Sequence, residues 1–233
     1  MQIEKSTVLI TGANRGIGLA FAKAFLARGA KKVYAGARDP SKLSLAGVTP
    51  IKLDVNSITD VQAASELAHD VTIVVNNAGI ANLGSFISED AEALLRNHLE
   101  TNVLGVLRIS RAFAPVLASN GGGALLNVAS VASWISSPQL ASYAVSKSAL
   151  WSLSNGLRND LRAQGTQVLT LHMSFVDTDL TKGLEMPKEK PEDIVERTLQ
   201  ALEAGVHEVL ADEITKQVKG GLSAEQSVYL AAL

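Results

Sequence analysis

A tyrosine and a lysine stand four residues apart, as Tyr143 and Lys147, in the stretch ASYAVSKSALWS at residues 141–152. Residues at this spacing lie on the same face of a helix. A phenol with a pKa of about 10 is a poor acid–base catalyst near neutral pH, and a neighbouring cation favours the phenolate and lowers that pKa. The alternative is a helix surface with an unremarkable tyrosine and a solvated lysine. The pair predicts proton transfer at a carbonyl or alcohol oxygen, provided that a cofactor supplies the hydride.

A glycine-rich stretch near the start of the chain, TGANRGIG at residues 11–18, has the composition of a phosphate-binding turn. Glycines let the backbone turn sharply and approach a ligand closely, and the N–H groups at the start of the following helix suit a pyrophosphate. The spacing is G-x3-G-x-G rather than the common G-x-G-x-x-G, so a plain tight turn is the alternative. We expect a dinucleotide to bind this turn through Gly12, Asn14, Arg15, Gly16, Ile17 and Gly18.

The choice between NAD and NADP depends on the residues that follow the run KKVYAGA at residues 31–37. An NAD site places an acidic residue there for the ribose 2′-hydroxyl, whereas this chain has Arg38 followed by Asp39. A guanidinium fits a 2′-phosphate through paired, charge-assisted hydrogen bonds, and Arg15 could reach the same phosphate. Asp39 is the competing candidate, but we interpret it as the cap of the turn DPSK. We therefore predict NADP(H) as the cofactor, with NAD(H) as the alternative.

The elements that must position these residues alternate along the chain. Apolar, strand-like runs lie near residues 6–11, 31–37, 49–55, 71–79, 122–130, 166–174 and 207–212. Helical patterns lie near residues 17–30, 57–69, 89–118, 139–164 and 191–205, and a mixed tail follows. Strands that are apolar throughout and alternate with helices predict an α/β fold with a doubly wound, Rossmann-type parallel sheet covered on both faces. We expect seven strands in a single domain over residues 1–233, because no linker or repeat divides the chain.

The composition narrows the possible functions. Hydrophobic residues make up 47% and charged residues 19% of the 233 residues, as in a globular protein. The net charge of −2 gives no electrostatic argument for nucleic acid or an anionic membrane as partner, and no apolar stretch reaches membrane-spanning length. There is no cysteine, and the four histidines lack the spacing of metal ligands, so we expect no metal site and interpret the histidines as structural or surface residues. The first strand-like run leaves no room for a signal peptide, and we expect a cytoplasmic protein.

Four motifs carry a family resemblance: TGANRGIG, NNAG at residues 76–79, Ser130 and YAVSK at residues 143–147. Their order and spacing resemble the short-chain dehydrogenase/reductase family, in its compact single-domain branch. The resemblance covers about residues 5–212 and implies the strand order 3-2-1-4-5-6-7. It implies that Asn102 completes a catalytic tetrad with Ser130, Tyr143 and Lys147. It also implies further cofactor contacts, at Asp54 and Val55 beside the adenine and at Asn77, Ala78 and Gly79 in the NNAG turn.

The predicted reaction divides between the cofactor and these side chains. The cofactor supplies the hydride, Tyr143 gives the proton, and Ser130 can hydrogen-bond the carbonyl oxygen and stabilise its developing charge. The resemblance adds that Lys147 also binds the nicotinamide ribose and that Asn102 holds a water molecule linking the lysine to solvent. The alternatives are a strand-end cap for Ser130 and a local helix hydrogen bond for Asn102.

The stretch MSFVDT at residues 173–178 departs from the family pattern P-G-x-V-x-T. Met173 and Ser174 replace the proline and glycine, whereas Val176 and Thr178 keep the pattern. The resemblance implies that this loop lies against the nicotinamide and that Thr178 binds its carboxamide, so both Val176 and Thr178 are predicted cofactor contacts. Losing a glycine where the backbone passes close to a ligand predicts a restricted φ or crowding at Ser174.

We expect loops near residues 80–86, 131–142 and 174–190 to form the substrate pocket. The stretch before Tyr143 has no charged residue, which predicts a neutral, hydrophobic ketone or aldehyde as substrate. The candidate lining residues could equally belong to the core; they are Trp134, Ile135, Leu140, Ser174, Leu180, Leu184 and Met186.

The leading hypothesis is an NADPH-dependent carbonyl reductase that runs reversibly as an alcohol dehydrogenase. A steroid or a 3-oxoacyl thioester is the alternative substrate, and an NADP-sensing regulator with the same fold is the non-enzyme alternative. Ser130, Tyr143 and Lys147 argue against the regulator, because a sensor needs no proton-transfer groups.

Apolar residues on the two longest predicted helices exceed what one buried face needs. The resemblance implies that these helices, near residues 89–118 and 139–164, form the interface of a homodimer or homotetramer. The apolar residues in question are Val103, Leu104, Val106, Leu107, Leu150, Trp151, Leu153 and Leu157.

Overall fold

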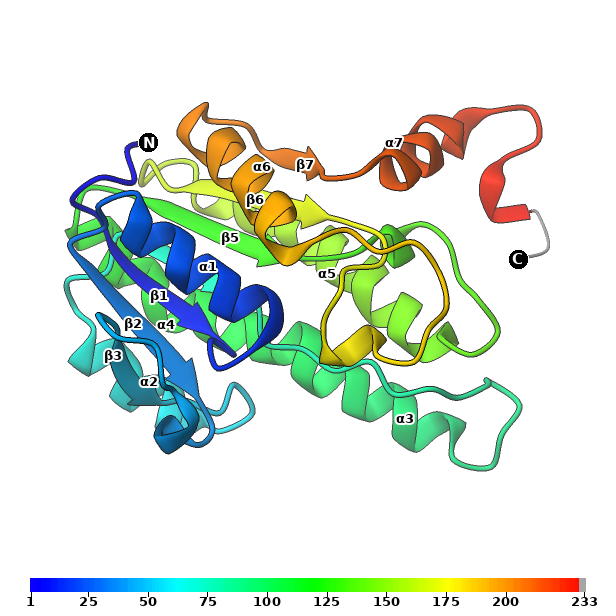
Figure 1. Ribbon diagram of the computed structural model, residues 1–233, viewed down its shortest axis with the longest axis horizontal. Coiled ribbons are helices and arrows are strands. Elements are labelled where there is room, and N and C mark those ends of the chain that lie inside the picture. Colours follow the sequence, from blue (N-terminus) through cyan, green and yellow to red (C-terminus); the bar gives the residue numbers. More distant parts are fainter. Residues whose placement is uncertain (231–233) are drawn as a thin grey trace.

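A computed structural model describes residues 1–230 and confirms the doubly wound α/β fold (Figure 1). Seven parallel strands form one sheet in the order β3-β2-β1-β4-β5-β6-β7. The order reverses between β1 and β4, and open sheets of this kind bind ligands beyond the carboxyl ends of the strands at such a switch point. The strands are β1 (Thr7–Thr11), β2 (Lys32–Ala37), β3 (Thr49–Lys52), β4 (Ile73–Asn76), β5 (Ala124–Val128), β6 (Gln167–His172) and β7 (Glu208–Leu210).

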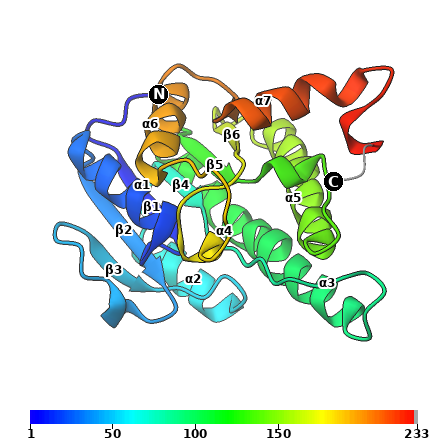
Figure 2. The same ribbon diagram turned by 45° about the vertical axis from the view of Figure 1, so that its right-hand side comes forward.

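Helices cover both faces of the sheet (Figure 1). On one face α1 (Gly16–Ala27) packs beside α6 (Pro191–Glu203), and on the other lie α2 (Ile58–Leu67), α4 (Gly105–Ser119) and α5 (Ala141–Asp160). Figure 2 shows α5 between α3 (Ala91–Leu99) and α7 (Glu213–Gly220), which lie beyond the body of the sheet. Among the described residues, no helix combines the length and hydropathy that crossing a bilayer requires.

The sheet separates two hydrophobic clusters. In β1, Val8 and Ile10 face the cluster under α1 and α6, whereas Leu9 faces the cluster under α2, α4 and α5, and all three side chains are fully buried. This two-sided burial explains why the strands are apolar throughout rather than alternating.

The long helix expected near residues 89–118 is interrupted. It begins at Ala91 and passes through a π-helical turn at Glu100–Leu104 before α4. π-helical turns inside α-helices occur frequently at functional sites. This turn contains Asn102, which the sequence predicts as a catalytic residue.

Candidate active site

A cleft of about 680 Å³ opens along the carboxyl ends of the strands. It runs from the first turn and the end of β2 to Tyr143 and Lys147 on α5, so one cavity contains both predicted parts of the site. The predicted residues that line it are Gly12, Asn14, Arg15, Gly16, Ile17, Arg38, Asp54, Val55, Asn77, Ala78, Gly79, Tyr143, Lys147, Thr178 and Leu180.

Glycines in the first turn bring the backbone close to its neighbours. Gly12 has φ +66°, and a Cβ there would lie 3.1 Å from the Cα of Ala78. Gly18 does not line the cleft; a Cβ at this position would lie 2.2 Å from the carbonyl oxygen of Gly12, so the glycine lets α1 pack against the turn. The resulting open turn, followed at once by the N-terminus of α1 at Gly16, fits the diphosphate of a dinucleotide.

Two asparagines at the end of β4 hold this part of the cleft together. Asn77 donates through Nδ2 to the carbonyl oxygens of Thr11 (3.0 Å) and Gly12 (3.1 Å), which fixes the entrance to the first turn. Asn76 donates to the side chain of Asn127 on β5 at 2.9 Å. The side chains therefore tie neighbouring strands, while the turn that contains Asn77 borders the cleft.

The far end of the cleft, beyond β2, is lined by Arg38, Asp39 and Lys42. The Asp39 carboxylate accepts hydrogen bonds from the N–H (3.2 Å) and the hydroxyl (2.7 Å) of Ser41, and these bonds lower its pKa. Asp39 is thus the cap of the DPSK turn, as the sequence predicted. Lys42 was missed by sequence reasoning, although the turn residues DPSK place it three positions after Asp39, within ion-pair distance at 3.6 Å.

Arg15 connects two loops across the cleft. Its guanidinium forms an ion pair with Asp179 at 3.2 Å, and both side chains are more than 60% exposed. Asp179 lies in the loop after β6, so the pair joins the first turn to that loop.

Three predicted catalytic residues lie around the carboxyl end of β5. Lys147 is buried and donates to the carbonyl oxygen of Val128 at 2.8 Å, and its ammonium lies 5.6 Å from the ring centre of Tyr143. Ser130 begins the 3₁₀ turn Val131–Ser133, and its hydroxyl oxygen accepts from the N–H of Ala132 at 3.1 Å. The cap considered as its alternative role is therefore present, and it leaves the hydroxyl proton available to a ligand.

Burial dominates the proton affinities of this pair. It raises the pKa of Tyr143 to about 12, against the opposing effect of hydrogen bonding with Ser130. It lowers the pKa of Lys147 to about 8. The net lowering of the tyrosine pKa that the sequence predicted is not found, because desolvation opposes charge on both groups and is the dominant effect. At neutral pH the phenol keeps its proton and can donate it.

Asn102 contacts the residue next to Lys147 rather than the Tyr143–Lys147 pair itself. Its side chain accepts from the N–H of Ile80 and donates to the carbonyl oxygen of Ile80, both at 2.9 Å, and it also donates to the hydroxyl of Ser146 at 2.9 Å. These partners lie after β4 and on α5, so a purely local role within its own helix is excluded. Asn102 holds the loop after β4 against the residue that precedes Lys147.

His98 is a buried histidine that sequence reasoning assigned only a structural or surface role. Its Nε2 accepts from the N–H of Asn82 at 2.9 Å, so Nδ1 carries the proton and donates to the hydroxyl of Ser142 at 3.0 Å. The imidazole meets the Tyr143 ring edge-on at 6.1 Å. Nothing in the spacing of these residues could have indicated the contact.

The loop after β6 holds Met173 and Ser174 without backbone strain. Among the described residues, Lys5 is the only residue other than glycine with a positive φ, so the strain expected at Ser174 is absent. Met173 lines the cleft, and the N–H of Ser174 donates to Asp212 at 2.7 Å. Val176 does not line the cleft; its side chain packs in the core under α1 and α6.

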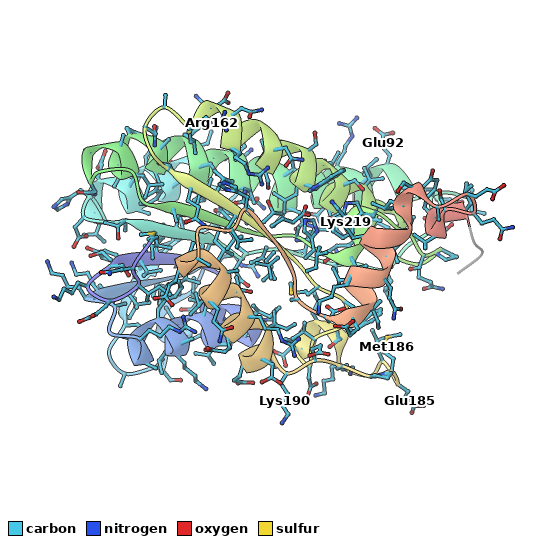
Figure 3. The ribbon with its side chains drawn as sticks, turned by 90° about the horizontal axis from the view of Figure 1, so that it is seen from above. Glu92, Arg162, Glu185, Met186, Lys190 and Lys219 are labelled. Atoms are coloured by element: carbon cyan, nitrogen blue, oxygen red, sulfur yellow. The ribbon has the colours of Figure 1, made fainter. Side chains whose placement is uncertain are left out.

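Most of the predicted substrate-pocket residues lie outside the cleft. Trp134 was placed wrongly: its ring stacks on His172 at 4.2 Å and meets Trp151 edge-on at 6.0 Å, which draws it into an aromatic cluster. Leu140 pairs with Gly84 through a β-bridge and so joins two of the expected loops. Leu184 and Met186 are 42% exposed, and Figure 3 shows Met186 at the outer end of its loop. Ile135 and Ser174 do not line the cleft either.

The cleft wall near Tyr143 includes Ile80 and Asn82 of the expected 80–86 loop, together with residues that were not predicted individually. They come from the loop after β4, from α3 and from the ends of β5 and β6, and they are Ile80, Asn82, Asn97, Val128, Ala129 and Met173.

Known proteins resemble this chain over most of its length. The family model described as short chain dehydrogenase matches residues 6–189. Galactitol 2-dehydrogenase (L-tagatose-forming) of Cereibacter sphaeroides is 33% identical over 202 residues, covering 82% of this chain and 78% of that protein. The 3-oxoacyl-[acyl-carrier-protein] reductase FabG of Salmonella typhimurium is 30% identical over 195 residues, covering 79% of each.

A solved structure matches nearly the whole chain. It is a short chain dehydrogenase from Burkholderia cenocepacia J2315 in complex with NADP, with a TM-score of 0.92 and 35% identity. The match covers 97% of this chain and 96% of that one.

Proposed function

The chain belongs to the short-chain dehydrogenase/reductase family and is an oxidoreductase acting on CH–OH or carbonyl groups, and from that premise we propose that it reduces a neutral ketone or aldehyde with NADPH. One observation carries the proposal. A single cleft is bordered by a glycine turn and cationic side chains at one end and by Tyr143 and Lys147 at the other, with Ser130 beside them. Hydride and proton can therefore reach one carbonyl group together.

The preference for NADPH is supported by the charges beyond β2. Asp39 is the acid that would bind a ribose 2′-hydroxyl, but its carboxylate is occupied by Ser41 and Lys42. Arg38 lines the same end of the cleft, and within residues 1–230 no hydrogen bond or ion pair holds its side chain. A 2′-phosphate would be bound by Arg38 and Lys42, with Arg15 in reach from the first turn. The 35% identical short chain dehydrogenase from Burkholderia cenocepacia J2315 is in complex with NADP.

The proposed proton transfers involve three side chains. NADPH supplies the hydride when bound. Ser130 donates its hydroxyl proton in a hydrogen bond to the substrate oxygen, and Tyr143 gives up its phenolic proton as negative charge develops there. Lys147 holds a positive charge below its pKa of about 8 and stabilises the tyrosinate that is formed. In alcohol oxidation the same groups act in reverse.

The substrate proposal rests on the cleft wall near Tyr143. Apart from Lys147, the lining residues there are uncharged, and Ile80, Met173 and Leu180 are apolar. A neutral, hydrophobic carbonyl compound fits this wall. A second candidate is a polyol and its ketose, because the amides of Asn82 and Asn97 also line the cleft and a 33% identical relative is a galactitol dehydrogenase.

Loss of NADPH absorbance with a panel of carbonyl compounds tests both candidates. The panel contains aryl ketones, ketoses and a 3-oxoacyl thioester, each assayed with NADPH and with NADH. We expect the highest kcat/KM with an aryl ketone and NADPH; ketose turnover alone would favour the second candidate. Turnover confined to the thioester, or NADH outperforming NADPH, would contradict the proposed substrate or cofactor.

We also propose that α4 and α5 form the interface of a homodimer or homotetramer. Support comes from Leu104 on the π-helical turn and Val145 on α5, which are 41% and 39% exposed. Val106, Leu150 and Leu157 were counted toward this surface from the sequence but are buried in the subunit itself. Light scattering of the protein as it elutes from a size-exclusion column measures the mass of the oligomer and tests the proposal. We expect Leu104→Lys to yield monomers.

A further inference from the structure

His172, the last residue of β6, lies directly behind the catalytic serine. Its side chain is fully buried, and Nδ1 lies 3.0 Å from the carbonyl oxygen of Ser130. A carbonyl oxygen only accepts hydrogen bonds, so Nδ1 carries the proton and donates it. The same oxygen also accepts from the N–H of Ser133 at 3.0 Å, the bond that closes the 3₁₀ turn after Ser130.

The backbone on either side of Ser130 is held by β6, but the Ser130 carbonyl is not. The N–H of Ala129 donates to Leu171 and the N–H of Val131 donates to Met173, both at 2.8 Å. The carbonyl between these two bonds depends on His172 for its link to β6. Since the hydroxyl of Ser130 and this carbonyl belong to one residue, the imidazole bond helps to fix the backbone from which the hydroxyl projects.

The imidazole is fixed by its own neighbours. Trp134 stacks on one face at 4.2 Å with an angle of 25° between the planes. Nε2 points toward Glu208, 3.6 Å away, and among the described residues it has no hydrogen-bond partner. Glu208 is paired with Lys219 at 3.3 Å.

Lys219 closes this cluster from α7. Its ammonium lies over the rings of Trp134 at 4.4 Å and Trp151 at 4.8 Å, within the range of cation–π attraction. Figure 3 shows Lys219 on the side of α7 that faces the rest of the molecule. Side chains from β7, α7 and the turn after Ser130 thus surround the imidazole, and Trp151 of α5 packs against Trp134.

We propose that His172 is a positioning residue: its Nδ1–H holds the Ser130 carbonyl and thereby aims the catalytic hydroxyl, and the cluster of Trp134, Glu208 and Lys219 holds the imidazole in place. The proposal rests on the proposed carbonyl reduction, in which Ser130 binds the substrate oxygen. Two buried polar groups of the cluster, His172 Nε2 and Trp134 Nε1, lack hydrogen-bond partners among residues 1–230.

The protonation state of His172 agrees with this role. Burial lowers its pKa to about 4; the bond to Ser130 and the Glu208 carboxylate oppose the shift, whereas Lys219 and Lys147 add to it. The ring is therefore neutral at working pH, with a single proton. That proton is on Nδ1, where the bond to Ser130 requires it.

Two amide variants separate positioning from simple packing. The Asn side chain places its amide near the position of Nδ1, whereas the Gln side chain places it near Nε2. We expect His172→Asn to keep kcat within about threefold of wild type and His172→Gln to lose about tenfold or more, since small displacements of a catalytic group have effects of this size. The KM for NADPH should be unchanged in both variants. Equal kcat values in the two variants would overturn the proposal.

Leu169→Ala is the matched control for stability. Leu169 is a fully buried residue of the same strand and is remote from Ser130, so its truncation should lower the melting temperature while kcat stays at the wild-type value. A drop in kcat equal to that of His172→Gln would show that loss of packing alone explains the effect and would overturn the proposal.

Nitrogen NMR of the histidine side chains tests the bond in the wild-type protein without any turnover. We expect the signal that disappears in His172→Asn to show the Nδ1–H tautomer from pH 6 to pH 8. The Nε2–H tautomer, or a doubly protonated ring, would overturn the positioning role. An Nδ1–H tautomer together with no reduction of any carbonyl compound would instead contradict the proposed function.

Lys219→Met provides a test that does not alter the buried histidine. Lys219 is 28% exposed, so the variant should fold, and the protein's only two tryptophans, Trp134 and Trp151, both report on the cluster. We expect a shift in tryptophan emission and a lower kcat at unchanged KM for NADPH. A shifted emission with wild-type kcat would overturn the role of the cluster in aiming Ser130.

Discussion

The two ends of the cleft hold their residues in different ways. At the cofactor end, backbone conformation and a local cap set most of the geometry: Gly12 turns with a positive φ, Gly18 lets α1 approach, and Asp39 caps its own turn. Asn77 adds one side-chain link to this turn. At the catalytic end the geometry depends on side chains that bond to distant segments. Lys147 is held by Val128, and the Ser130 carbonyl is held by His172.

This difference determines which substitutions each end of the cleft tolerates. A region whose geometry depends on close backbone contacts is disrupted by an added carbon atom, whether the added group is polar or apolar. An end built from side-chain hydrogen bonds is disrupted by the loss of one polar atom, even when volume is kept. Substitutions that remove a polar atom at the catalytic end and add a carbon atom at the cofactor end test this contrast.

Tyr143→Phe removes one oxygen from the catalytic end and should have the largest effect on rate. General acid catalysis contributes roughly 10²- to 10⁴-fold, so we expect kcat to fall by that range while NADPH affinity stays the same. Steady-state kinetics and a fluorescence titration with NADPH measure the two quantities. Tyr229→Phe is the control, because Tyr229 is 54% exposed and does not line the cleft. Turnover that survives in Tyr143→Phe would refute the proposed acid.

Gly18→Ala adds one carbon atom to the cofactor end. The new Cβ would lie 2.2 Å from the Gly12 oxygen and 2.5 Å from Asn77 Nδ2, so the turn must shift. Overpacking of this kind lowers the free energy of unfolding by about 1–3 kcal/mol, and we expect a matching rise in the KM for NADPH.

Gly156→Ala is the matched control for the Gly18 variant. Gly156 lies within α5, and a Cβ there would meet nothing within 4 Å. Alanine should stabilise this helix by about 0.5–1 kcal/mol because glycine loses more backbone entropy on folding. Thermal unfolding of both variants gives the comparison; a Gly18 variant as stable as the Gly156 variant would contradict the backbone argument.

The same contrast explains which parts of the site the sequence could predict. The structural roles of Gly12, Gly16 and Asp39 depend on residues close to them in the sequence, so the spacing in TGANRGIG and DPSK predicts the two turns. His98, His172 and Asn82 act on partners brought close only by the folded sheet, and no local pattern indicates them. Val176 and Trp134 lie outside the cleft lining for the same reason, since an apolar side chain after a strand can turn into the core as readily as into a cleft. The strand order followed from family resemblance rather than from periodicity.

Arg38→Ala tests how the cofactor end recognises charge. Charge-assisted hydrogen bonds contribute about 1.5–3 kcal/mol, so loss of the guanidinium should lower kcat/KM for NADPH about 10- to 100-fold and leave that for NADH nearly unchanged. Arg111→Ala, an exposed arginine on α4, is the control. An unchanged preference in Arg38→Ala would remove this residue from the proposed phosphate site.

The pH dependence tests the catalytic end without mutation. Tyr143, with a pKa of about 12, stays protonated over the working range, whereas Lys147 loses its charge above about pH 8. Since a group of pKa 8 is about 90% charged at pH 7 and about 10% at pH 9, carbonyl reduction should fall about tenfold over that interval. Alcohol oxidation needs the phenolate and should rise with pH instead. A reduction rate that rises between pH 7 and pH 9 would contradict the assigned proton donor.

Asp179→Asn should have the smallest effect, and it tests the contact that joins the first turn to the loop after β6. The Arg15–Asp179 pair is largely exposed, and such pairs contribute little to stability, so the melting temperature should hardly change. Loss of the carboxylate leaves Arg15 without its ion-pair partner and able to turn toward a 2′-phosphate. The KM for NADPH should then fall about two- to threefold, a size typical of one exposed charge pair, while the KM for NADH stays constant. Asp160→Asn, at the exposed end of α5, should change neither value. An equal change in both KM values would mean that the loop after β6, rather than the charge of Arg15, responds to the substitution. Asp179 would then position the two loops and would not compete with the phosphate for Arg15.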